Sequence, residues 1–139
     1  MKIRKFLPLA ASFFAWSVFF LPSAAQNQQP LSPEEQEKQL TEYIDKEVQR
    51  LSDLLKLEYW QEFYVDSTLT HDLHARKDEM MAMEKARVEN LDLYMAVSDK
   101  WMEKIDSSYK RFFTPAQWEK YWKVSGKRAQ KEREKRKKK

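Results

Sequence analysis

Apolar residues recur at three- and four-residue spacing along most of the chain, which is the pattern of amphipathic helices. One such stripe predicts a helix over residues 33–56, and a second predicts a longer helix over 58–87. A third stripe predicts a helix over 92–112, separated from the second by a tight turn around 88–92. The second and third helices should therefore form a long antiparallel hairpin, with the first helix beside it.

Two short segments carry helix-start signals. In Ser32-Pro33-Glu34-Glu35, a serine N-cap is followed by proline at the first helical position and by glutamate three residues after the cap. Phe113-Thr114-Pro115-Ala116-Gln117 repeats this arrangement, with Thr114 as the cap and Gln117 three residues after it. The third helix should stop there, and we expect a short fourth helix that ends at Gly126.

The composition indicates an all-α fold and divides the chain into parts. Glycine occurs once and proline three times beyond residue 25, whereas a sheet protein needs turn residues far more often. We expect a polar linker over 26–31, a helical domain over 32–126 and a basic tail over 127–139. The tail holds nine lysines and arginines against two glutamates, so it is predicted to be disordered. The full chain carries a net charge of only +4, so the helical domain is acidic.

Residues 1–25 are typical of a secretory signal peptide, although an uncleaved membrane anchor is the alternative. A basic start is followed by an apolar run over 6–21 and by small residues that end at Ala25. We expect cleavage after Ala25, so that a mature chain beginning at Gln26 resides in the periplasm. The absence of cysteine excludes disulfide bonds, thiol chemistry and a lipoprotein anchor.

The segment 113–117 resembles the LTxxQ box of the Spy/CpxP-like family of periplasmic proteins. Thr114 and Gln117 match the box, Pro115 occupies a variable position, and Phe113 stands where the family has leucine. The family carries two such boxes, one opening the second long helix and one opening the last short helix.

A partial match to the box lies at residues 57–61, where Leu57 and Gln61 match but Glu58 replaces threonine. Glutamate is a poor N-cap, so the first two helices either join through a loose kink or run on as one. A hairpin that turns near residue 89 also places Gln61 opposite Gln117, without any appeal to the family.

The resemblance implies an elongated homodimer that shields unfolding envelope proteins without ATP. The residues themselves offer aromatic and methionine surface beyond what a small core needs, and we expect this surface to bind clients or close the dimer. Its candidate residues are Trp60, Phe63, Met81, Trp101 and Met102. A periplasmic adaptor that binds the extracytoplasmic domain of a membrane signalling kinase is the alternative function, and a purely structural envelope protein is a third.

The sequence offers little chemistry. It contains no nucleophile–base pair, glycine-rich phosphate loop or paired-carboxylate motif, so we expect neither an enzyme nor a cofactor. His71 and His74 are weak candidates for a metal site, because histidines three apart on a helix can share an ion, but exposed histidines are commonplace. The basic tail either contacts an anionic membrane surface or acidic envelope polymers, or serves solubility, and export leaves no nucleic-acid partner.

Overall fold

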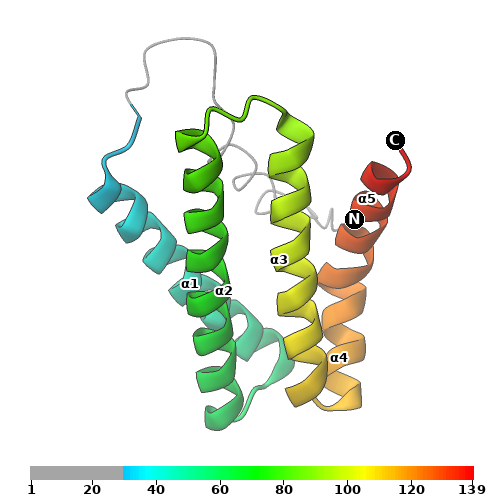
Figure 1. Cartoon of the computed structure of the whole chain (residues 1–139). Coiled ribbons are helices and arrows are strands. Elements are labelled where there is room, and N and C mark those ends of the chain that lie inside the picture. The colour runs from blue at the N-terminus through cyan, green and yellow to red at the C-terminus, as the bar shows by residue number, and fades with distance from the viewer. Residues whose placement is uncertain (1–29) are drawn as a thin grey trace, which may run out of the picture. The chain divides into compact units, whose positions relative to one another are not determined.

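The computed structural model describes residues 30–139, and every secondary-structure element in that range is a helix (Figure 1). The elements are α1 (Pro33–Leu55), α2 (Tyr59–Lys85), α3 (Leu91–Phe112), α4 (Pro115–Tyr121), a π-helical turn η1 (Trp122–Gly126) and α5 (Lys127–Lys137). The last three follow one another without a gap and make one continuous helix. The predicted all-α fold with four helices is therefore confirmed. Over the same described range, we find no helix of the length and apolarity needed to cross a membrane.

Local chemistry at Ser32 and Lys56 explains where α1 begins and ends. The Ser32 hydroxyl accepts from the Glu35 amide at 3.2 Å, and the Glu35 carboxylate accepts from the Ser32 amide at 2.9 Å. At the other end Lys56 adopts the left-handed conformation with φ of 53°, which stops the helix. The first two helices are thus separate rather than continuous.

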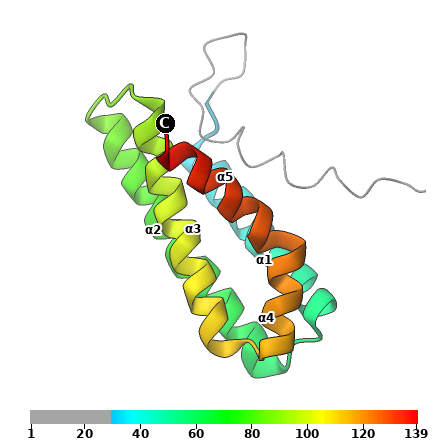
Figure 2. The same cartoon turned by 90° about the vertical axis from the view of Figure 1, so that its right-hand side faces the viewer.

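The turn between α2 and α3 is closed by polar contacts. Arg87 takes a positive φ of 57°, and the Asn90 side chain caps α3 by accepting from the Asp92 amide at 2.9 Å. The Tyr94 hydroxyl donates to the Val88 carbonyl at 2.8 Å and pins the turn to the first turn of α3. Helices α2 and α3 then run side by side in opposite directions (Figures 1 and 2).

The core lies where α1, α2, α3 and the start of the last helix meet. Its buried apolar side chains are Ile44, Leu51, Leu55, Val65, Leu69, Leu73, Met80, Tyr94, Ile105, Tyr109, Phe113 and Tyr121. Aromatic rings dominate one end, where Tyr109 stacks on Phe113 at 5.0 Å and meets Tyr121 edge-on at 5.3 Å. Burying one large apolar side chain fully contributes about 1.5–3 kcal/mol to the stability of the fold.

The basic segment, predicted to be disordered, is instead helical as α5. Its inward side chains reach acidic residues of α3: Arg133 donates to Asp106 at 2.8 Å, and Arg136 donates to Asp99 at 2.6 Å. Composition alone indicated a solvated tail because it does not show which charges have partners far away in the sequence.

Gly126 does not end a helix, contrary to the prediction. It has ordinary helical φ of −73° and lies inside the continuous helix α4–η1–α5. A Cβ atom at this position would lie 2.2 Å from Cε3 of Trp122, so the indole occupies the space that any other residue's side chain would need. The last helix is therefore longer than the short one predicted.

Candidate functional site

The two motif segments meet at one end of the α2–α3 hairpin, where α1 passes into α2 and α3 passes into α4 (Figures 1 and 2). The Gln61 side-chain amide donates to Oε1 of Gln117 at 2.7 Å, and the Gln117 amide donates back to Oε1 of Gln61 at 3.1 Å. The placement of these two residues opposite each other, predicted from hairpin geometry, is confirmed.

Each glutamine also joins its own helix start to the end of the helix before the other box. Gln61 accepts from the Glu58 amide at 3.0 Å and donates to the Phe112 carbonyl, the last residue of α3, at 3.0 Å. Gln117 accepts from the Thr114 amide at 2.9 Å and donates to the Leu55 carbonyl, the last residue of α1, at 3.3 Å. The two side chains form a two-fold-like node that ties four helix ends together, which we call the glutamine node.

Burial makes the glutamine node energetically important. The Gln61 side chain is 1% exposed, and a buried amide left without partners costs about 1–3 kcal/mol. Phe113 is also buried, and the Thr114 hydroxyl accepts from the Gln117 amide at 3.2 Å beside Pro115 at the first helical position. The second box is thus a complete capping box.

The first box works without the threonine. The Glu58 carboxylate accepts from the Trp60 indole, and the Gln61 side chain accepts from the Glu58 backbone amide as in a capping box. A hydrogen bond from the Ser52 hydroxyl to the Glu62 carboxylate holds the end of α1 against the start of α2. Leu57 is half-buried between them. These contacts keep the junction closed although Glu58 is a poor N-cap.

Four aromatic side chains lie exposed directly beside this junction, on the first turns of α2. Tyr59 is 87% exposed, Phe63 61%, Tyr64 51% and Trp60 46%, and we call them the α2 aromatic patch. Tyr64 contacts the rings of Trp60 at 6.1 Å, Phe63 at 5.9 Å and Phe112 at 5.7 Å. Trp60, Phe63 and Tyr64 therefore form a connected aromatic surface that continues to Phe112, and Tyr59 lies on the same first turn of α2.

Of the five residues predicted to form a client or dimer surface, Trp60 and Phe63 lie in the α2 aromatic patch. The prediction omitted Tyr59 and Tyr64, although the sequence shows four aromatic residues within 59–64. A run this aromatic at a helix start cannot face inward on every side, and this was the available signal.

The other three candidates lie along the hairpin and are half-buried. The Trp101 indole donates to Glu79 at 2.7 Å, with Nζ of Lys104 4.6 Å from its ring centre. Nη1 of Arg76 lies 3.9 Å from the Met102 sulfur, and Met81 is likewise only partly exposed. Trp101 and Met102 thus bridge α3 to α2. Burial lowers the pKa of Arg76 to about 10.

The two histidines have different partners. Nδ1 of His71 lies 2.8 Å from the carboxylate of its neighbour Asp72, and its side chain is largely exposed. His74 contacts Glu37 of α1, as does Lys77. Within residues 30–139, no three acidic or histidine side chains lie close enough together to hold a metal ion.

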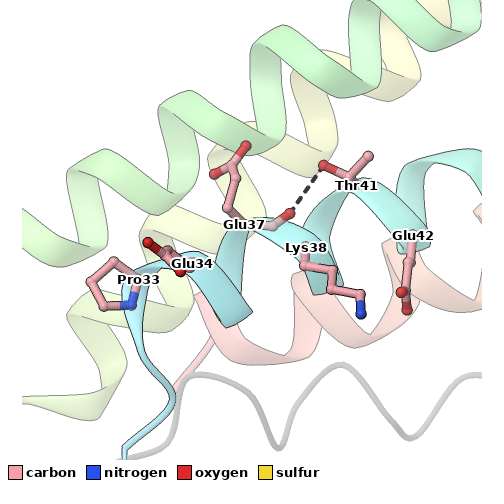
Figure 3. Close-up of a pocket in the computed structure, with 6 residues that line it drawn as sticks. All are labelled: Pro33, Glu34, Glu37, Lys38, Thr41 and Glu42. Atoms are coloured by element: carbon pink, nitrogen blue, oxygen red, sulfur yellow. Dashed lines mark hydrogen bonds between the residues drawn. The ribbon is translucent and has the colours of Figure 1, made fainter.

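A shallow hollow of about 590 Å³ lies on the first turns of α1, away from the motif residues (Figure 3). Its lining residues are Pro33, Glu34, Glu37, Lys38, Thr41 and Glu42. The Thr41 hydroxyl donates to the Glu37 carbonyl at 3.0 Å, which is an ordinary contact inside a helix (Figure 3). The hollow brings together no acid–base or nucleophile–base pair, so it offers surface rather than chemistry.

Comparisons with protein-family models, with curated proteins and with solved structures found no match. The glutamine node and the adjoining α2 aromatic patch are the features of the described residues that combine the motif positions with exposed apolar surface. A polar node can fix helix directions, and an apolar patch can bind other apolar groups.

Proposed function

We propose that this protein is a Spy/CpxP-like periplasmic chaperone that binds partly unfolded proteins without ATP. The observation that carries the proposal is the α2 aromatic patch, exposed on a helix start whose position the glutamine node fixes. Connected apolar surface of this kind is costly to leave in water and usually marks an interaction site.

The motif residues give the proposal further support. In the second box, Gln117 closes the capping box and also crosses to the first junction, so the same residue serves a local and a long-range role. The carboxylates of Glu58 and Glu62 lie at the same helix start as the patch, and a surface of mixed apolar and charged groups suits clients that expose both. On this proposal the same surface also closes a homodimer in the absence of client.

An aggregation assay with an unrelated, chemically unfolded protein tests the function. The wild type should suppress light scattering at equimolar ratio, and the variant Phe63→Ser should lose most of that effect. Leu93→Ser is the matched control, because Leu93 is 50% exposed but lies at the other end of the hairpin. Equal suppression by both variants would show that the α2 aromatic patch does not bind the unfolded protein.

Two further measurements address the setting. Sedimentation equilibrium should give a dimer whose association weakens in Phe63→Ser.

Intact-mass analysis of protein from the cell envelope should show a chain that begins at Gln26, and full-length protein in the cytoplasm would contradict the proposed location.

A signalling adaptor is the second candidate. The Trp60 indole is held in one orientation by Glu58, and a rigid aromatic side chain of this kind suits a single folded partner. A pull-down that recovers one stoichiometric partner, together with no suppression of aggregation, would favour the adaptor.

A further inference from the structure

The continuous helix α4–η1–α5 turns one set of charges toward α3 and another toward solvent. On the inner side, Arg133 binds Asp106 at 2.8 Å, and two nitrogens of Arg136 bind both oxygens of Asp99 at 3.0 and 2.6 Å. Lys137 binds Glu103 at 2.8 Å. These contacts neutralise the inner cations and fix the rotation of α5 about its own axis.

The outer side carries a row of exposed cations. At 3.6 residues per turn, the residues Lys127, Arg128, Lys131, Lys135 and Lys138 fall within an arc of about 100°. No acidic residue falls inside this arc, and Glu132 and Glu134 lie just beyond its two edges. We call these five residues the cationic stripe.

The charges of the cationic stripe are almost entirely unneutralised. Lys135 lies 3.6 Å from Glu132, and within residues 30–139 the other four have no acidic partner within ion-pair distance. Two exposed residues precede the stripe along the same helix. Lys123 lies about one turn before Lys127, and Val124 lies three residues before it. The basic residues of the chain's end are thus sorted into an inner set that holds the fold and an outer set with no role in it.

We propose that the cationic stripe docks this protein on an anionic lipid bilayer. The stripe is straight and about 16 Å long, so its charges can all meet a plane of lipid headgroups at once. Lysines near such a surface attract anionic lipid additively. Nucleic acid fits less well, because the stripe interleaves no aromatic side chains on which bases could stack. Val124 is a small apolar group, so the helix adsorbs on the surface without inserting.

The test is co-sedimentation with vesicles, using the protein as it is recovered from the producing cells. Vesicles of equimolar phosphatidylcholine and phosphatidylglycerol should bind it, while phosphatidylcholine vesicles should bind it at least about tenfold less. The triple variant Lys127→Gln, Arg128→Gln, Lys131→Gln should lose at least about tenfold of the binding to anionic vesicles. Added salt should weaken wild-type binding.

The matched control removes the same charge from α1 and α2. Lys38→Gln, Lys46→Gln, Lys85→Gln changes three exposed lysines, two on α1 and one at the end of α2, and should keep most of the binding. Circular dichroism should show that both variants keep wild-type helicity. Equal losses in the two variants would reduce the effect to net charge and overturn the proposal. So would equal binding to both kinds of vesicle, or tighter binding of a duplex oligonucleotide than of anionic vesicles.

Discussion

At the scale of single residues, the glutamine node depends on the chemistry of the amide. One amide both accepts and donates, so Gln61 caps α2 through its oxygen while its nitrogen reaches two acceptors at the other junction. A glutamate lacks the donor, and a lysine lacks the acceptor. Glutamine is therefore the side chain that can serve the cap and the cross-link together at both positions.

Removing either glutamine should destabilise the fold. Gln61→Ala and Gln117→Ala should each lower the free energy of unfolding by about 1–3 kcal/mol, because each leaves buried partners unsatisfied. The double variant should lose clearly less than the sum, with a coupling of about 0.5–3 kcal/mol. Urea denaturation of the four proteins measures this, with Gln130→Ala on α5 as a control near zero. Strict additivity would show that the two amides do not act together.

Gly126 is predicted to resist substitution. Alanine normally stabilises a helix relative to glycine by about 0.8–1.0 kcal/mol, but here its Cβ would meet the Trp122 ring. Gly126→Ala should therefore destabilise the protein and disturb the stacking of Trp122 on Trp118, whose rings lie 5.4 Å apart. Thermal unfolding and near-ultraviolet circular dichroism report these effects, with Lys120→Ala as the control. An increase in stability would show that the ring does not rest on Gly126.

Glu37 gives the protein a predictable response to acid. Its hydrogen bond with Lys77 and the smaller effect of its hydrogen bond with His74 lower the pKa of Glu37 below its usual 4.5. The contribution to stability is present above pH 4.5 and is lost as the pH falls through the lowered pKa. Because the carboxylate is half exposed, Glu37→Gln should cost less than about 1 kcal/mol at pH 7. The variant should also lose less stability than the wild type between neutral pH and pH below 4, which urea denaturation across that range measures.

At the scale of elements, the sequence predicts those boundaries that depend on neighbouring residues. The caps at Ser32 and Thr114 and the apolar spacing place α1, α2 and α3 to within about two residues. The opposition of Gln61 and Gln117 was also predictable, because it follows from where the hairpin turns. The hydrogen bonds of the glutamine node to the carbonyls of Leu55 and Phe112 were not predictable. Every residue has a backbone carbonyl, so the sequence does not show which of them accepts.

Helix α5 was missed because its stability depends on contacts distant in sequence. Arg133 and Asp106 are 27 residues apart, and nothing in the basic run distinguishes Arg133 from the exposed lysines around it. The π-helical turn likewise depends on how Trp122 packs over Gly126, which local propensity does not encode. A basic segment is thus ordered here by partners that only the tertiary fold supplies.

The attachment of α5 can be tested through Asp106. Asp106 accepts from Tyr121 at 2.6 Å and from Arg133, and both Asp106 and Arg133 are buried. Asp106→Asn would remove the nearer carboxylate and leave Arg133 with only Glu103, whose Oε1 lies 3.8 Å from Nε of Arg133. Breaking a buried ion pair costs about 3 kcal/mol or more, so a large part of that cost should remain. We expect α5 to detach from α3 in this variant. The amides of residues 127–137 should then exchange hydrogen much faster, while those of α2 change little. Glu132→Gln, on the outer face, should leave the exchange unchanged, and slow exchange in both variants would contradict the attachment.

At the scale of the whole described domain, the two proposed surfaces lie on different helices and share no residue. The α2 aromatic patch lies at the start of α2, whereas the cationic stripe lies on α5, which the ion pairs with α3 hold in place. One surface is apolar and the other cationic, so salt should weaken the second far more than the first. Their partners, unfolded chains and anionic bilayers, should therefore bind together rather than compete.

This independence leads to a crossed experiment. Phe63→Ser should lose suppression of aggregation and keep vesicle binding, whereas the triple variant of the cationic stripe should lose vesicle binding and keep suppression. The wild type should suppress aggregation equally well when bound to anionic vesicles, because the bilayer meets α5 and leaves α2 open. Light scattering with and without vesicles, followed by sedimentation to locate the protein, measures both properties in one sample. Loss of suppression on vesicles would mean that the bilayer covers the aromatic patch, and the two surfaces would then act as alternatives.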